Sequence, residues 1–479
     1  MVEKYIIGID GGSQSSKVVI FDLNGNEVSR GQERLQPMST PDHGVVEHPG
    51  DDLWDSLCKA SQKAMGSFPG NEEDIIGIGL CTIRFNRCLL KMDGTLASPA
   101  ISWMDDRVSK PYEHKNDDVA YVTTSSGYIT HRFTNEFKDT NANYMGMWPI
   151  DTDTWQWSDS DEVFDYYNIP QDMLFTIQDP GTILGNVTDK AAKETGIPAN
   201  IPVIATANDK AVEALGSGII SSHSALVSLG TYIAGMILGQ ENTKNSKSFW
   251  TNFASIPGEY LYESNGIRRG MWTVSWFTDL YGEELTVTAR KHGMSPEEFL
   301  NEEAAKSVPP GSDGLMTVLD WLPPADKPFK KGMMIGLDSR HTRAHMYQSI
   351  LEGIAMTMKT NMDSMLDEVD QNIKEMVISG GGSNSDLMMQ ILSNVFGLPT
   401  KRNVTNGSAS LGAAINVAVA LNVYSTYEEA TKHMVKVKDM FHPEEDKHAF
   451  YTRMNNEVYQ HISAYTDGIL RKSYSFFNS

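Results

Sequence analysis

The stretch YIIGIDGGSQSSKVVIFD, residues 5–22, places a small polar corner between two apolar runs near the start of the chain. A strand, a Gly-Gly corner and a second strand predict a β-hairpin. The corner also holds Asp10, Ser13, Ser15 and Lys17. Backbone N–H groups of small residues converge on anions, and a carboxylate can hold a magnesium ion or its waters. These residues alone leave an ordinary hairpin and a phosphate-binding hairpin equally open.

Length and composition restrict the possible classes of protein. A chain of 479 residues is too long for one core and predicts two large domains. The net charge of −22 argues against a nucleic-acid or anionic-membrane partner. Cys58, Cys81 and Cys88 lack metal-ligand spacing, and neither a signal-like start nor a membrane-length apolar run is present. We therefore expect a cytoplasmic protein.

Apolar runs alternate with helical patterns along the chain, which predicts an α/β architecture. The predicted helices include residues 51–65 and 344–369, and the β-rich runs are residues 5–10, 18–23, 75–80, 203–209, 225–238 and 375–383. The run at 225–238 repeats the strand–corner–strand pattern of the N-terminus. The repeat predicts two related domains, residues 1–219 and 220–479, that face each other across a cleft.

Four separated pieces of sequence suit one chemistry. They are the Asp10 hairpin, the segment around Asp209, the corner SLGTY around Thr231, and ISGGGSNSDLMMQIL from Ile378. Phosphoryl transfer from ATP uses two phosphate-binding corners, a carboxylate for Mg²⁺, a carboxylate that accepts the acceptor's proton, and a Gly-rich surface for the nucleotide. The set therefore predicts an ATP-dependent phosphotransferase.

The same pieces resemble the FGGY family of carbohydrate kinases, which belongs with the actin, sugar-kinase and heat-shock ATPase superfamily. The similar motifs, spread over nearly the whole length, are IDGGSQSSK, WMDDR, NDKAVEALGSG, SLGTY and SGGGSNSDLMMQILSNVFGLP. The resemblance implies two ribonuclease H-like domains, each a mixed central sheet flanked by helices, with a cleft between them. It also implies phosphorylation of a hydroxyl of a small carbohydrate, a ketose, polyol or sugar acid, by ATP with Mg²⁺.

The resemblance assigns roles to individual residues. Asp209 is the expected general base and Asp10 the expected metal ligand. The expected ATP-binding residues are Gly12, Ser13, Gln14, Ser15, Lys17, Gly230, Thr231, Gly270, Ser275, Gly381, Gly382 and Asp386, the last standing where the family often has Asn. The expected substrate-binding residues are Arg84, Phe85, Trp103, Asp105, Asn208, Asp209 and Lys210.

Several alternatives stay open. Asp209 also suits the N-cap of a helix, and an Asp105–Arg107 pair could simply lock two loops. A regulatory nucleotide-binding relative without transfer activity and an actin-like or chaperone ATPase are the rival functions. Retention of both Asp10 and Asp209 argues against the regulatory reading.

The chain departs from the family's common patterns at the acceptor side. Residues 82–85 read Thr-Ile-Arg-Phe, where glycerol kinases carry Asn-Gln-Arg-Glu and xylulokinases Gln-Met-His-Gly, so neither standard activity is expected. The segment 108–120 is shorter than in typical members, which leaves the pocket more open or completed by a second subunit of a homodimer. Arg84, Lys210 and Arg268 or Arg269 suggest a sugar-acid acceptor, unless these cations pair with local acids.

Overall fold

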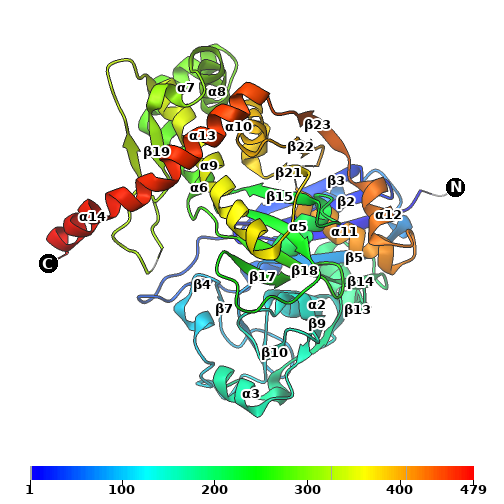
Figure 1. The fold of residues 1–479 in the computed structure, drawn as a ribbon. Coiled ribbons are helices and arrows are strands. Elements are labelled where there is room, and N and C mark those ends of the chain that lie inside the picture. Colours follow the sequence, from blue (N-terminus) through cyan, green and yellow to red (C-terminus); the bar gives the residue numbers. More distant parts are fainter. Residues whose placement is uncertain (1–2, 325, 406, 479) are drawn as a thin grey trace.

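Two mixed β-sheets form the centre of the molecule, one in each half of the chain (Figure 1). The computed structural model describes residues 3–324, 326–405 and 407–478. The first sheet has the order β13 (Ile183–Asn186), β14 (Pro202–Asn208), β5 (Ile75–Thr82), β1 (Tyr5–Gly11), β2 (Ser15–Asp22) and β3 (Glu27–Arg34). The second has the order β17 (Phe249–Phe253), β18 (Tyr260–Ser264), β16 (Ile233–Gly239), β15 (Ser224–Leu229), β21 (Glu375–Ser379), β22 (Thr400–Asn403) and β23 (Val437–Phe441).

The two sheets repeat one pairing scheme. β1 pairs antiparallel with β2 and parallel with β5, and β15 pairs antiparallel with β16 and parallel with β21. β1 and β15 are buried over most of their length, which explains why both strands are nearly continuous apolar runs. The predicted α/β class and the repeated strand–corner–strand pattern are confirmed. The two sheets lie on either side of residue 219.

Helices and short strands surround the two sheets. The helices are α1 (Asp52–Gly66), α2 (Ser125–Thr134), α3 (Asp161–Tyr167), α4 (Asp189–Thr195), α5 (Asp209–Gly216), α6 (Gly270–Leu280), α7 (Gly282–Lys291), α8 (Pro296–Ser307), α9 (Arg343–Val369), α10 (Asp386–Phe396), α11 (Ser408–Ala420), α12 (Tyr427–Met434), α13 (Glu445–Met454) and α14 (Gln460–Phe477). The short strands are β4 (Glu47–His48), β6 (Cys88–Leu90), β7 (Ala100–Ile101), β8 (Tyr121–Thr123), β9 (Lys138–Thr140), β10 (Ile150–Asp151), β11 (Gln156–Trp157), β12 (Thr176–Gln178), β19 (Met316–Val318) and β20 (Met333–Ile335).

Helices α5 and α11 join the two halves. Leu215 of α5 and Leu411 of α11 share one apolar cluster with Ile6 of the first sheet. The two helices approach so closely that a Cβ added at Gly412 would lie 2.0 Å from the Val212 carbonyl oxygen. An α-carbon without a side chain is therefore required at this crossing. Because α11 belongs to the C-terminal half yet packs on the first sheet, the halves cannot separate without breaking this cluster.

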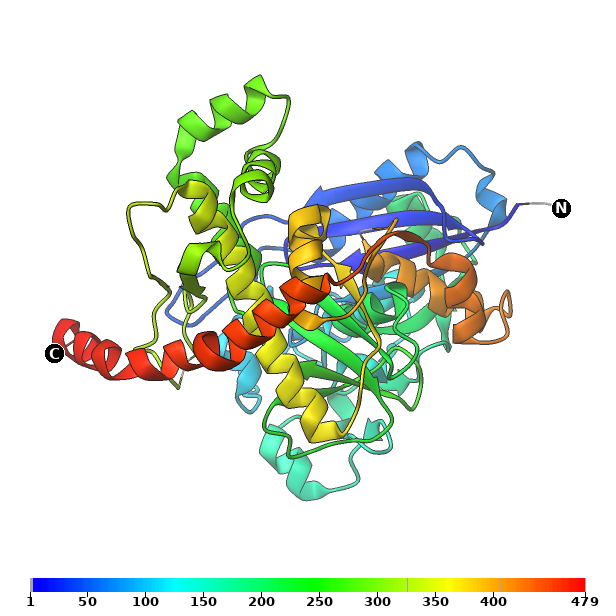
Figure 2. The same cartoon turned by 45° about the horizontal axis from the view of Figure 1, so that its top comes forward.

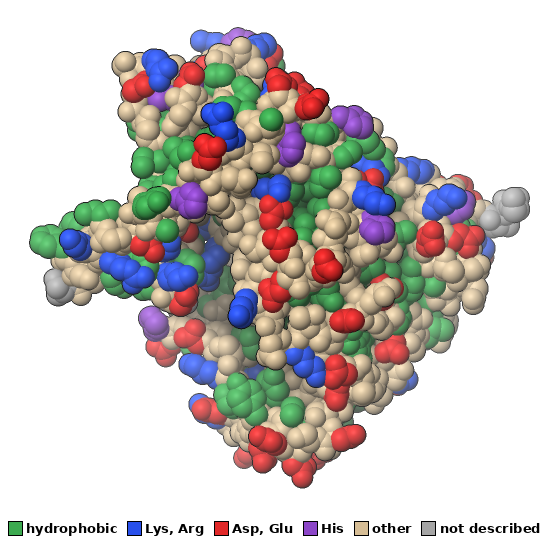
Figure 3. Space-filling model, viewed as in Figure 1, with side chains coloured by type: hydrophobic (Ala, Val, Ile, Leu, Met, Phe, Trp, Pro, Cys, Tyr) green, Lys and Arg blue, Asp and Glu red, His purple; other side chains and the backbone are tan. Residues whose placement is uncertain are grey.

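The outer helices give the molecule its shape. The long α9 runs beside the second sheet, and α14 projects from the body so that the C-terminus lies on the opposite side from the N-terminus (Figures 1 and 2). Acidic side chains are scattered over the face that Figure 3 shows, as the net charge leads one to expect. None of the helices within the described ranges is both long and apolar enough to cross a membrane.

Candidate active site

The hairpin between β1 and β2 forms the first corner of the candidate site. Asp10 pairs with Lys17 across the two strands, and the Gly12 N–H donates to the Ser15 carbonyl at 3.1 Å to close the turn. The backbone N–H groups of Ser13 and Gln14, at the tip, donate to no acceptor within the described parts of the chain. Two free amides at a tight turn are suitable donors for an anion.

The second corner lies between β15 and β16. Leu229 pairs with Ile233, which leaves Gly230, Thr231 and Tyr232 as the loop. The first amides of α6 support this loop, since the Gly270 N–H donates to the Thr231 carbonyl at 2.8 Å. Gly270 therefore holds the corner in place, while the Thr231 side chain is exposed.

The carboxyl ends of three parallel strands bring the chemical groups together. β5 lies between β1 and β14 in the first sheet, and Thr82 at its end pairs with both Gly11 and Asn208. Asp10 at the end of β1, Arg84 just after β5 and Asp209 just after β14 therefore meet at one edge of the sheet. Ligands of open α/β sheets bind at such an edge.

Asp209 is the first residue of α5, and its carboxylate is available for chemistry. The N-cap is Asn208, whose side-chain oxygen accepts from the Ala211 N–H at 3.2 Å, so the interpretation of Asp209 as the cap is wrong. The buried Oδ1 of Asp209 has no hydrogen-bond partner among the described residues. Burial raises the pKa of Asp209, while the charges of Arg84 and Lys210 oppose the rise.

Arg84 forms a buried ion pair across the two halves. Its Nη2 donates to Oε2 of Glu263 on β18 at 2.7 Å, and its Nη1 donates to Oε1 of the same carboxylate. The guanidinium lies 4.9 Å from the ring centre of Trp250 and 5.1 Å from that of Phe85. Phe85 has a φ of 60°, an unfavourable backbone conformation for an aromatic residue. The pairing with Glu263 holds the pKa of Arg84 above its usual range, although burial alone would lower it.

Lys210 also pairs with an acid. Its Nζ donates to Oε2 of Glu213 at 2.8 Å and to Oγ of Ser228 at 3.0 Å. The other oxygen of Glu213 accepts from Ser228 and Ser379, which lie on two strands of the second sheet. Lys210 and these two hydroxyls hold the pKa of Glu213 low against the effect of burial. This cluster is a second polar connection between the halves.

The remaining expected acceptor-binding residues have internal partners or are exposed. Asn208 is buried, and its side-chain amide donates to the carbonyl of Ala142 at 3.0 Å. Asp105 is 2% exposed, and its two oxygens accept from the Val46 N–H and from Arg107. These contacts favour the loop-locking interpretation of the Asp105–Arg107 pair. Trp103 is 48% exposed.

The Gly-rich loop after β21 gives the expected nucleotide surface. A Cβ added at Gly381 would meet no atom within 4 Å, whereas one at Gly382 would lie 2.8 Å from Leu229. The lack of a side chain at Gly381 thus leaves open space beside the loop, and the lack of one at Gly382 lets the loop pack against Leu229, just before the second corner. Asp386 accepts from Arg402 at 2.9 Å. Ser275, on α6, is exposed.

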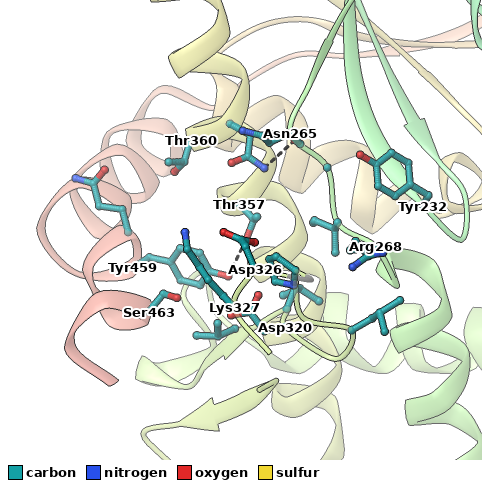
Figure 4. Close-up of a pocket in the computed structure, with 18 residues that line it drawn as sticks. Tyr232, Asn265, Arg268, Asp320, Asp326, Lys327, Thr357, Thr360, Tyr459 and Ser463 are labelled. Atoms are coloured by element: carbon teal, nitrogen blue, oxygen red, sulfur yellow. Dashed lines mark hydrogen bonds between the residues drawn. The ribbon is translucent and has the colours of Figure 1, made fainter. Parts of the chain in front are cut away.

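A cavity of about 560 Å³ adjoins the second corner at Tyr232 (Figure 4). Loop 265–268, residues 318–324 and 326–327, α9 and the start of α14 line it. Burial and the charge of Glu263 raise the pKa of Tyr232, while the charges of Arg84, Lys210 and Arg268 oppose the rise. The lining carries as many cations as acids, namely Arg268 and Lys327 against Asp320 and Asp326.

Sequence reasoning missed the acids that neutralise the site's cations. Glu263 and Asn252, which donates to Glu263 at 3.3 Å, lie in segments without a recognisable motif, whereas Glu213 lies within the motif NDKAVEALGSG but was given no role. Glu213 lies three residues after Lys210, and this helical spacing was an available signal for that pair. Glu263 is 179 residues from Arg84, and no local pattern indicates such a pair.

Comparison with known proteins places this geometry in one family. The profile of the FGGY family of carbohydrate kinases matches residues 5–119 and 108–216 with its N-terminal domain and residues 225–421 with its C-terminal domain. An uncharacterized sugar kinase of Escherichia coli (strain K12) is 54% identical over 474 residues, which cover 99% of this chain and 96% of that protein.

More distant relatives agree with this placement. The autoinducer-2 kinase of Escherichia coli (strain K12) is 25% identical over 495 residues, covering 93% of this chain and 92% of that protein. The crystal structure of xylulose kinase from Rhodospirillum rubrum superposes with a TM-score of 0.83 at 21% identity, covering 98% of this chain and 100% of that one. The expected two-domain fold is confirmed.

Proposed function

The chain belongs to the FGGY family of carbohydrate kinases and is a phosphotransferase, and on this premise we propose that it phosphorylates a neutral ketose or polyol, with Asp209 as the general base. ATP is the family's phosphate donor. The two corners, one from each half, would hold the phosphates, and the loop with Gly381 would receive the nucleoside.

One observation carries the assignment of the base. Asp209 Oδ1 is buried, accepts no hydrogen bond from any described residue, and belongs to a carboxylate at the edge where Asp10 and Arg84 also lie. A buried carboxylate oxygen without a donor is costly unless a ligand supplies one. The hydroxyl of a carbohydrate acceptor is such a donor.

The proposed reaction needs little from the base beyond position. The acceptor hydroxyl would donate its hydrogen bond to Asp209 and pass its proton there as its oxygen forms a bond to the γ-phosphorus. The bond between that phosphorus and the bridging oxygen to ADP breaks, and the electron pair leaves with ADP. Positioning and charge stabilisation supply most of the rate in such transfers.

Asp10 fits the magnesium ion that accompanies ATP. Its carboxylate lies 3.6 Å from Lys17 Nζ, and no other cation pairs with it among the described residues. Mg²⁺ is usually held by one or two carboxylates together with substrate phosphates and water. Asp10 would therefore hold the ion or its waters, and the bound ion would offset charge on the phosphates.

The charges of the site favour a neutral acceptor over a sugar acid. Glu263 neutralises Arg84 and Glu213 neutralises Lys210, both through short contacts. Arg268 donates to the Pro323 carbonyl at 3.0 Å in a cavity whose charges balance. A substrate carboxylate would have to displace a buried internal acid from its cation, which is unfavourable.

Replacing Asp209 tests the assignment. We expect Asp209→Asn to lower kcat at least about 100-fold while leaving the Kd of ATP nearly unchanged. Asp189→Asn is a matched control, because Asp189 is likewise the first residue of a helix and follows a side-chain N-cap. Full transfer activity in Asp209→Asn, measured as sugar phosphate formed, would refute the role of the base.

A coupled ADP-release screen over ketoses, polyols and sugar acids tests the acceptor class. We expect ATP turnover to rise sharply with one or more neutral compounds. ATP hydrolysis that no acceptor stimulates would favour the rival ATPase interpretation. Stimulation by sugar acids alone would contradict the neutral acceptor but not the transfer reaction.

A further inference from the structure

Arg87 is a buried cation without an anionic partner among the residues that the structure describes. It is 4% exposed and follows Arg84 by three residues. Its Nη1 donates to the Arg107 carbonyl at the long distance of 3.4 Å, and its Nε is buried without an acceptor among the described residues. The guanidinium lies 6.0 Å from the ring centre of Tyr112 and 5.8 Å from that of Trp148. Arg87 thus leaves most of its donors unused.

This environment is unfavourable for a charged group. Burial lowers the pKa of Arg87 to about 10, and the nearby charge of Arg107 adds to this effect, while Tyr112 and Asp105 oppose it. The Asp105 carboxylate already accepts from Arg107 and from the Val46 N–H. A buried guanidinium with no paired acid is rare, because its desolvation is not repaid.

Arg87 lines a cavity of about 340 Å³ beside β7, which we name the Arg87 cavity. Its volume lies within the range of small-molecule sites. The apolar part of the wall is made by Leu89, Ile101, Pro111, Tyr112 and Val119. The wall residues from Lys110 to Val119 fall where the two pieces of the N-terminal family match overlap, at 108–119.

The charge at this cavity is opposite to that of the whole chain. Arg87, Arg107, Lys110 and Lys115 line it together with one acid, Glu113, and Arg107 also pairs with Glu47 and Asp105 outside the lining. Glu113 is exposed and pairs with Lys115, and Lys110 forms no ion pair with any described residue. In a chain with a net charge of −22, an apolar cavity with an excess of cations is a distinctive feature.

We propose that the Arg87 cavity is a second binding site, separate from the phosphoryl-transfer cleft, for a small organic anion. Its carboxylate or phosphate group pairs with the Arg87 guanidinium, and its apolar body packs on Leu89, Pro111 and Val119. The planar fork of arginine matches either oxyanion. Neither the transfer reaction nor any expected site residue uses Arg87.

Isothermal titration of the full-length protein with 4-bromobenzoate and with phenyl phosphate tests the site. Saturating Mg-ADP is included so that the nucleotide corners are occupied. We expect one site for at least one probe, an affinity at least about tenfold weaker in Arg87→Met, and no change in Arg30→Met, which removes a remote exposed cation. Tighter binding of 4-bromobenzoate would indicate a ligand with a carboxylate group, and tighter binding of phenyl phosphate would indicate a ligand with a phosphate group.

The ligand-free variant separates a binding role from a structural one. Because the Arg87 charge has no acidic partner in the described ranges, Arg87→Met should keep or raise the Tm without ligand, and only the wild type should gain Tm with the probe. Equal probe affinity in Arg87→Met, or no binding to the wild type, would overturn the proposal.

A crystallographic measurement needs no variant. The bromine of 4-bromobenzoate soaked into wild-type crystals should give an anomalous peak beside Leu89, Pro111 and Val119. If Arg87→Met does not fold, this peak and the weaker binding of Arg87→Lys, which keeps the charge without the planar fork, decide the question. Bromine found only outside the cavity would refute the site.

Discussion

At the scale of single residues, charges of both signs act on Asp209, the proposed general base. Burial raises the pKa of Asp209, the charges of Arg84 and Lys210 lower it, and the charges of Asp10 and Glu213 raise it. The base must be deprotonated to act, so activity should be lost as the pH falls through the Asp209 pKa. That pKa lies above the ordinary Asp range.

The acid limb of the pH profile is the pH range over which activity is lost as the pH falls. Two variants should shift this limb in opposite directions. Lys210→Met removes a cation that stabilises the Asp209 carboxylate, so the limb of kcat/KM against pH should shift to higher pH. Glu213→Gln removes an anion and frees Lys210, so the limb should shift to lower pH. Shifts in the same direction in both variants would contradict Asp209 as the titrating group.

The buried Arg84–Glu263 ion pair should make the effects of its two single substitutions on stability strongly non-additive. Arg84→Met or Glu263→Gln leaves the other charge buried, and each is expected to lower the free energy of unfolding by about 3–5 kcal/mol. The double variant should lose clearly less than the sum. Urea denaturation of the wild type, the two single variants and the double variant gives the coupling energy of the pair. The exposed Arg30–Glu27 pair is the control, and its coupling energy is expected to be below about 1 kcal/mol. An additive double variant would contradict the pairing.

The residue types at the corners were predictable, but their partners were not. Gly12, Thr231 and Gly381 could be identified from the sequence, because glycines and hydroxyl residues between or just after apolar runs are a local pattern. Glu263 is selected for Arg84 by the way the second sheet packs on the first, and nothing near Glu263 in sequence indicates it. Because Arg84 and Lys210 pair with acids, the alternative left open by the sequence holds for these two cations, and a ketose or polyol is proposed over a sugar acid.

At the scale of elements, continuous apolar strands were predicted and polar ones were missed. The runs at 5–10, 75–80 and 203–209 became β1, β5 and β14, and the predicted helices at 51–65 and 344–369 became α1 and α9. β3 was not predicted, because it is an edge strand with alternating exposed polar residues. Its position is fixed by α1, which packs so closely that a Cβ at Gly31 would lie 1.9 Å from the Ala60 carbonyl.

The contact between α5 and α11 gives a prediction at this scale. Gly412→Ala puts a methyl group against the backbone of α5 and should lower the free energy of unfolding by about 1–3 kcal/mol. Gly468→Ala is the control, since Gly468 lies within α14 with no atom near its missing Cβ. That change should instead stabilise by about 0.5–1 kcal/mol. Chemical denaturation measures both, and a neutral Gly412→Ala would contradict the close contact.

At the scale of the whole molecule, the candidate site is divided between two halves. Asp10 and Asp209 come from the first sheet, whereas Thr231 and Gly381 come from the second. Glu263 and Glu213 pair with groups of the opposite half close to the reaction centre. A ligand that contacts both halves therefore binds best when they are correctly positioned, so the two substrates should help each other to bind.

This reciprocity can be measured once the screen has identified an acceptor. The acceptor should tighten the Kd of a non-hydrolysable ATP analogue by roughly 5–150-fold, and the analogue must tighten the Kd of the acceptor by the same factor. Isothermal titration in both orders gives the two factors. Glu263→Gln should reduce the factor, because it breaks the connection between the half that carries Arg84 and the half that carries Thr231, whereas Asp189→Asn should not. Equal affinities with and without the second ligand would show that the halves bind their substrates independently, and the shared cleft would then be wrong.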